Sequence, residues 1–156
     1  MPITSGSFPS ASLPGLDGPP CPIAEAGFGA QALVLIGHCG CRTTRYTLPL
    51  VDRIHRRLTR GRVTAVLQDD APTARAVVDQ LHLALHVQLE ADPYPLADAL
   101  GLEVVPTIFA LDEDGVITGM SEGLRRADLE AFAHRLGVPG ALFGPEDAKI
   151  PAHKPG

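Results

Sequence analysis

The sequence predicts an α/β fold in which a mixed central sheet is flanked by helices. Short uninterrupted apolar runs, typical of strands buried on both faces, alternate along the chain with segments of helical spacing. Such alternation favours parallel strands joined by right-handed crossovers. Farther along, two apolar runs joined by an acidic turn predict a β-hairpin, which adds antiparallel strands. The length of 156 residues and the hydrophobic share of 45% suit a single globular domain.

The first half of the chain supplies two strands and two helices. Residues 32–36 are a continuous apolar run, which predicts a buried strand, and residues 63–67, apolar except for Thr64, predict a second one. Between them, apolar residues recur at helical spacing over 43–58 and predict an amphipathic helix. Pro72 predicts the start of a helix over 72–81, because proline fits the first helical turn.

The second half completes the order β-α-β-α-β-α-β-β-α. Gly101 ends one predicted helix, and Gly137 with Pro139 ends the last one. The predicted elements are a strand at 86–89, a helix at 95–100, hairpin strands at 104–111 and 116–118, and a helix at 125–136.

Composition divides the chain into three parts. Residues 1–30 are rich in Pro, Gly, Ser and Ala, which predicts a partly irregular N-terminal segment. Residues 31–138 form the predicted domain. Residues 139–156 contain prolines but no periodicity, so we expect a C-terminal tail.

Several functional classes receive no support. The net charge of −5 argues against nucleic-acid binding, and the basic run 53–62 is interpreted as the solvated end of a helix. Neither GxGxxG nor GxxxxGK[ST] occurs, so no nucleotide cofactor is expected. No apolar stretch is long enough to span a membrane, and no secretory signal pattern is present at the start. We therefore expect a cytoplasmic protein with no membrane association.

Cys41 is the candidate reactive residue because it lies where the first strand gives way to a helix. Helix N–H groups and the helix dipole lower the pKa of a thiol at that position. His38 and Arg42 are close in sequence and would add positive charge. Pro49 lies inside the following helix. Pro106 lies at the start of a strand whose apolar residues otherwise indicate a position in the middle of the sheet. A cis Val105–Pro106 bond is one explanation of that proline.

This combination resembles the thioredoxin superfamily, in which a CxxC motif opens a helix that contains a proline. Counting back from Pro49, the motif is Cys41-Arg42-Thr43-Thr44. The resemblance makes Cys41 the nucleophile and Pro106 the cis-proline that faces it, with Val105 in the same loop. Gly115 and Gly123 match glycines of the hairpin region, and the region 63–100 is similar to the redoxin branch, which includes peroxiredoxins and cytochrome-maturation thioredoxins.

The chain departs from that family at three positions. Thr44 replaces the resolving cysteine, Gly40 replaces an aromatic residue, and His38 stands where peroxiredoxins have threonine. Thr44 either caps backbone N–H groups or hydrogen-bonds the thiolate. Cys39 is either a buried apolar residue or a resolving thiol at the limit of disulfide reach. Cys21 is remote in sequence, and its segment is not assigned to a helix or strand.

Two classes of function follow. The first is a monothiol thiol-disulfide oxidoreductase in which Cys41 attacks a protein disulfide, or a peroxide as in a thiol peroxidase, and an external thiol such as glutathione resolves the product. The second is a non-catalytic binding module that keeps the fold and its groove. His38, Cys39 and Cys41 would also suit zinc or copper(I), but no second Cys/His cluster supports them, so no metal is expected. The sequence predicts no oligomeric state.

Overall fold

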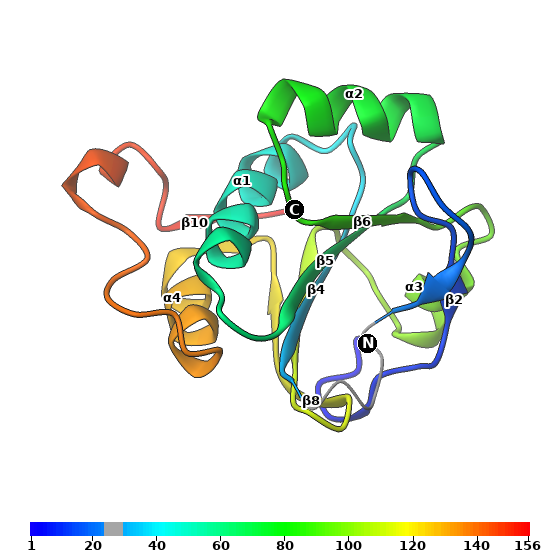
Figure 1. Ribbon diagram of the computed structural model, residues 1–156, viewed down its shortest axis with the longest axis horizontal. Helices are drawn as coiled ribbons and strands as arrows, with labels where there is room; N and C mark the ends of the chain where they lie inside the picture. The colour runs from blue at the N-terminus through cyan, green and yellow to red at the C-terminus, as the bar shows by residue number, and fades with distance from the viewer. Residues whose placement is uncertain (24–29) are drawn as a thin grey trace.

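A computed structural model describes residues 1–23 and 30–156 and contains one mixed six-stranded sheet (Figure 1). β4 pairs in parallel with β5, and β5 with β6, while the pairs on the other side of β4 are antiparallel. The mixed sheet of the predicted α/β fold is therefore confirmed. In spatial order the strands are β1 (Gly6–Ser7), β8 (Val116–Glu122), β7 (Thr107–Leu111), β4 (Ala32–Gly37), β5 (Arg62–Leu67) and β6 (His86–Leu89).

Helices pack on both faces of this sheet. Along β4, Leu33 and Leu35 belong to a core with α1, α2 and α4, whereas Val34 and Ile36 belong to a core with α3 and the N-terminal segment. Figure 1 shows α1 and α4 on one side of the strands and α3 on the other. The bounds agree with the predicted ones to within one residue: α1 (Arg42–Arg57), α2 (Ala71–Leu81), α3 (Pro95–Ala99) and α4 (Arg126–Arg135).

The predicted hairpin is shifted toward the C-terminus. β7 begins at Thr107, because residues 104–106 form a loop in which the Val105–Pro106 peptide bond is cis. A second cis bond joins Asp92 and Pro93. β8 continues to Glu122, beyond the predicted end at residue 118.

The N-terminal segment is more ordered than its composition predicts. β1 adds a sixth strand to the sheet by pairing with β8, and β2 (Ser12–Leu13) pairs with β3 (Cys21–Pro22). Phe8 packs edge-on against Phe109, with ring centroids 5.6 Å apart. The apolar residues of this segment are few, and they are spaced too irregularly to give a periodic signal. Residues 24–29 lie outside the described part of the chain.

The expected C-terminal tail is instead packed against the domain. Val138 and Leu142 are buried in the core of α1 and α4, and a short 3₁₀ turn, η1 (Pro145–Asp147), follows. The chain then forms β10 (His153–Lys154), which pairs antiparallel with β9 (Leu124–Arg125). We refer to residues 138–150 as the C-terminal arm. The arm runs beside α1 and α4 in Figure 1.

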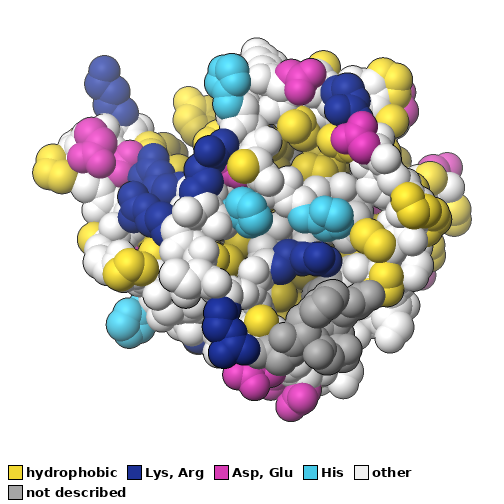
Figure 2. Space-filling view, viewed as in Figure 1, with side chains coloured by type: hydrophobic (Ala, Val, Ile, Leu, Met, Phe, Trp, Pro, Cys, Tyr) yellow, Lys and Arg dark blue, Asp and Glu magenta, His cyan; other side chains and the backbone are white. Residues whose placement is uncertain are grey.

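The basic run at the end of α1 anchors the chain, and this corrects its interpretation as a solvated helix end. Arg53 pairs with Asp147 at 2.9 Å, and Arg57 donates to the Ala141 carbonyl at 3.0 Å. In Figure 2, Lys and Arg side chains gather on the left, where α1 and the C-terminal arm meet in Figure 1.

Among the described residues, no helix combines the length and apolar character needed to cross a membrane.

Asp52 joins α1 to the loop before β6. Its buried carboxylate accepts hydrogen bonds from the backbone N–H groups of Ala84 and Leu85, both at 2.8 Å. The other oxygen pairs with Arg56 at 2.7 Å. Removing this carboxylate would leave two N–H groups without their acceptor.

We therefore predict that Asp52→Ala lowers the free energy of unfolding by about 3 kcal/mol, because buried N–H groups lose their partner. Urea denaturation followed by circular dichroism measures the change. The control is Asp79→Ala on the exposed face of α2, expected to change stability by less than about 0.5 kcal/mol. Equal stability of the two variants would contradict the anchoring role of Asp52.

Candidate active site

Cys41 is the N-cap residue directly before α1, at the strand-to-helix transition that the sequence predicts. A tight turn connects it to β4, in which the Cys41 N–H donates to the His38 carbonyl at 2.9 Å. Cys41 has extended backbone angles, and its carbonyl accepts from the Arg45 N–H at 3.1 Å, which closes the first helical turn. The sulfur is therefore next to the free N–H groups at the helix start.

The thiol faces the loop that contains the cis peptide bond. The Cys41 Sγ lies 3.6 Å from the Val105 carbonyl oxygen, to which the protonated thiol donates. The Val105–Pro106 bond next to it is cis. The structure therefore brings together Cys41, Val105 and Pro106, which are 64 and more positions apart in the sequence.

The surroundings of Cys41 favour its thiolate. Burial by itself would raise the pKa of Cys41. This effect is outweighed by hydrogen bonds from the N–H and hydroxyl of Thr44, a hydrogen bond from the Thr43 N–H, and the positive charge of Arg45. The net result is a pKa below that of an ordinary thiol, so more of Cys41 is ionised near neutral pH.

Thr44 lies one helical turn after Cys41, at the position where the resemblance to the thioredoxin superfamily would place a second cysteine. Its side chain is fully buried, and its hydroxyl accepts from the His38 N–H at 3.4 Å. The hydroxyl also contributes to lowering the Cys41 pKa. Both roles considered for Thr44 have support: its hydroxyl accepts from a backbone N–H, that of His38, and it also lowers the pKa of Cys41.

Cys39 has the opposite chemical environment, although it is only two residues away. Its side chain is buried, and its N–H donates to the Asp69 carboxylate at 2.8 Å. Burial, together with a hydrogen bond and the negative charge of Asp69, raises the pKa of Cys39 to about 12. Cys39 therefore stays protonated near neutral pH and has the environment of a packing residue.

The positively charged side chains near Cys41 differ in part from the predicted ones, His38 and Arg42. The His38 ring accepts from the Gly40 N–H at 2.7 Å and lies 4.0 Å from the Asp69 carboxylate. Arg42 and Arg45 are both exposed, and of the two it is Arg45 whose charge lowers the pKa of Cys41. The signal for Arg45 is its spacing, because residues four apart share one side of a helix.

Cys21 lies in a different environment. Its sulfur is 3.6 Å from the His86 ring and 3.3 Å from the Gln88 amide, at the β6 edge of the sheet. All three cysteines are free. In the described part of the chain, no three His, Cys, Asp or Glu side chains are arranged to hold a metal ion.

The C-terminal residues are the part of this site that sequence reasoning missed. The Thr43 hydroxyl donates to the Pro155 carbonyl at 2.6 Å. Gly156 lies against the Val105 carbonyl, so closely that a Cβ at this position would collide with it. Residues after 139 show no periodicity, and therefore nothing in the sequence pointed to this contact.

We predict that Thr44→Val raises the pKa of Cys41 toward that of a free thiol, because the hydroxyl hydrogen bond is lost. The pH dependence of alkylation by iodoacetamide, with mass mapping of Cys41, measures this pKa. At pH 7 the variant should react several-fold more slowly than the parent. Thr44→Ser, which keeps a hydroxyl, is the matched control. An unchanged pKa in Thr44→Val would show that this hydroxyl does not stabilise the thiolate.

Comparison with known proteins identifies the fold. No protein-family model and no curated protein sequence matches the chain. Among similar solved structures is a thioredoxin domain of a thiol-disulfide oxidoreductase from Bacteroides vulgatus, with 16% identity and a TM-score of 0.75, covering 85% of this chain and 96% of that one. A thioredoxin-family thiol:disulfide interchange protein from Chlorobium tepidum has 18% identity and a TM-score of 0.71, covering 87% of this chain and 99% of that one. A secreted disulfide oxidoreductase from Mycobacterium tuberculosis has 14% identity and a TM-score of 0.69, covering 81% of this chain and 96% of that one. The chain thus has the thioredoxin-like fold.

Proposed function

We propose that this protein is a monothiol thiol-disulfide oxidoreductase with Cys41 as its nucleophile. The observation that supports this most is the position of the Cys41 sulfur, at a helix start and 3.6 Å from the Val105 carbonyl in the cis-proline loop. The lowered pKa of Cys41 supplies the thiolate that disulfide exchange needs. The structural neighbours named as thiol-disulfide oxidoreductases support the same chemistry.

The proposed reaction has three exchange steps. In the first, the Cys41 thiolate attacks one sulfur of a protein disulfide, forms a mixed disulfide and releases the other sulfur as a thiolate. In the second, an external thiolate attacks that mixed disulfide at one sulfur, and a proton is taken up by the thiolate that leaves. When the attack falls on the Cys41 sulfur, the substrate leaves with both of its thiols reduced. A second external thiolate then attacks the adduct on Cys41, which regenerates the Cys41 thiolate and joins the two external thiols in a disulfide.

An external thiol is needed because neither neighbouring position supplies an internal one. Thr44 replaces the resolving cysteine, and the pKa of Cys39 is raised to about 12. A thiol with that pKa is almost entirely protonated near neutral pH and reacts slowly. Such a mechanism suits a compartment rich in reduced thiols, so the proposal includes a cytoplasmic location.

A cationic hollow beside the site suits glutathione as the external thiol. It lies on the exposed side of the first turns of α1, and its lining includes Arg42, Arg45 and Tyr46. Two guanidinium groups there would attract the carboxylates of a small acidic thiol. This charge favours glutathione over a neutral thiol of similar size.

We predict that Cys41→Ser abolishes disulfide reduction, because the attacking thiolate is lost, whereas Cys21→Ser leaves the rate nearly unchanged. The assay follows reduction of a glutathionylated peptide in the presence of glutathione. Mass spectrometry of the parent after exposure to oxidised glutathione should show an adduct on Cys41. Activity retained in Cys41→Ser would overturn the proposal, and absence of any adduct would favour a non-catalytic binding module instead.

A second prediction concerns the resolving position. Thr44→Cys places a thiol one helical turn from Cys41, where an internal disulfide can form. The lifetime of the glutathione adduct on Cys41 should then fall at least about tenfold, because an intramolecular thiol reacts at high effective concentration. The control is Thr44→Ser, which introduces no thiol and should keep the long lifetime. Equal lifetimes in the two variants would contradict the single-cysteine mechanism.

A further inference from the structure

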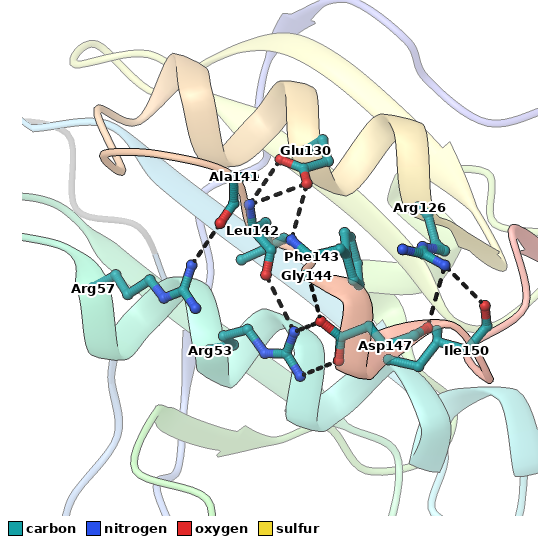
Figure 3. A network of polar contacts seen from close by, with 10 residues as sticks. All are labelled: Arg53, Arg57, Arg126, Glu130, Ala141, Leu142, Phe143, Gly144, Asp147 and Ile150. Atoms are coloured by element: carbon teal, nitrogen blue, oxygen red, sulfur yellow. Dashed lines mark hydrogen bonds and ion pairs between the residues drawn. The ribbon is translucent and has the colours of Figure 1, made fainter.

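The C-terminal arm is fastened to the domain by several charged side chains. Arg53 donates to both oxygens of Asp147, at 2.9 and 3.1 Å, and to the Leu142 carbonyl at 3.1 Å (Figure 3). The guanidinium of Arg53 holds the pKa of Asp147 below its usual range, with a further contribution from the Gly144 N–H. The arm is thus held by charge-assisted hydrogen bonds, which are stronger than neutral ones.

α4 supplies the other half of this attachment. The Glu130 carboxylate accepts from the N–H groups of Leu142 and Phe143 at 3.0 Å, and Arg126 lies 4.5 Å from the centre of the Phe143 ring. Arg126 also donates to the Ile150 carbonyl at 3.1 Å (Figure 3). These contacts fix the point from which residues 151–156 leave the arm.

Residues 151–156 then run toward the thiol. The Arg126 N–H donates to the Ala152 carbonyl at 3.0 Å, and β10 pairs with β9 so that Lys154 lies opposite Leu124. Gly123 has a φ of +71°, and a Cβ there would lie 2.6 Å from the Lys154 carbonyl oxygen. Glycine at 123 therefore leaves room for this segment to lie close to the hairpin end.

The end of the segment contacts both sides of the site. The Pro155 carbonyl accepts from the hydroxyl of Thr43, which is buried in the first turn of α1, at 2.6 Å. Gly156 contacts the Val105 carbonyl, which is the group that the Cys41 thiol faces at 3.6 Å. Lys154 also reaches Tyr46, with its ammonium 5.6 Å from the ring centre. The segment therefore bridges the active-site helix and the cis-proline loop.

We propose that residues 151–156 are an internal strap that competes with protein substrates for the groove beside Cys41. A protein chain entering along Val105 needs the space that Pro155 and Gly156 occupy, so the strap has to be displaced first. Pro155 and Gly156, the residues nearest Cys41, are held by the Thr43 hydrogen bond and by backbone contacts with Val105 and Gly123, whereas the arm is held by several charged groups. The strap can therefore open while the arm stays attached. This inference deepens the proposed function, because it concerns access to the same thiol.

The test compares labelling of Cys41 by a small and a bulky reagent. Iodoacetamide and a polyethylene-glycol maleimide are used in a Cys21→Ser background, at a pH where Cys41 is largely ionised. The full chain is compared with Gly156→Val, whose side chain would collide with the Val105 carbonyl, and with a deletion of residues 153–156. The control is Gly18→Val, because a Cβ at Gly18 meets open space.

We expect the bulky-to-small rate ratio to rise at least about fivefold in Gly156→Val and in the deletion, because the rate follows the fraction of open molecules. Gly18→Val should match the parent. An equal ratio in the parent and both strap variants would overturn the strap. If the ratio rises but no variant reduces disulfides, the strap stands and the proposed function fails. If the parent reduces disulfides and the ratio does not change, the proposed function stands and the strap fails.

Discussion

At the start of α1, the N–H groups of Thr43 and Thr44 hydrogen-bond toward the Cys41 sulfur instead of a helical carbonyl. This arrangement exists because β4 is buried along its whole length and the helix begins shortly after it, at the carboxyl edge of the sheet. Moving Cys41 by one residue in either direction would remove it from these donors. The strand, the tight turn and the helix together therefore determine where a thiolate is stable.

The contrast between Cys39 and Cys41 shows how local this effect is. Both residues belong to one short connection, yet the pKa of Cys41 is lowered while that of Cys39 is raised to about 12. Cys39 is turned into the core and toward the Asp69 carboxylate, which disfavours a second negative charge. A carboxylate near one thiol and helix N–H groups near the other thus give two identical side chains opposite pKa shifts, upward for Cys39 and downward for Cys41.

Much of the fold could be predicted from the sequence, because each strand of the central sheet except β1 is long enough to give a pattern. The helix bounds and the position of Cys41 at a helix start followed from the spacing of apolar residues, and the facing position of Val105–Pro106 followed from the resemblance to the thioredoxin superfamily. What could not be predicted depends on isolated contacts. Asp69 and Pro155 reach the site through hydrogen bonds from distant segments, and such contacts leave no periodic trace. The same holds for Phe8 and Leu142, which are buried from segments that look irregular.

The N-terminal segment has a consequence for how molecules of this protein behave toward one another. β1 lies outside β8, and the Pro14 carbonyl accepts from the Leu89 N–H on β6, so one segment reaches both margins of the sheet. Exposed strand margins are templates for pairing with other chains, and proteins avoid aggregation by covering them. Trimming these residues as if they were a dispensable leader would uncover backbone donors and acceptors at two places. We therefore expect the segment that looks least structured in the sequence to limit self-association through the margins of the sheet.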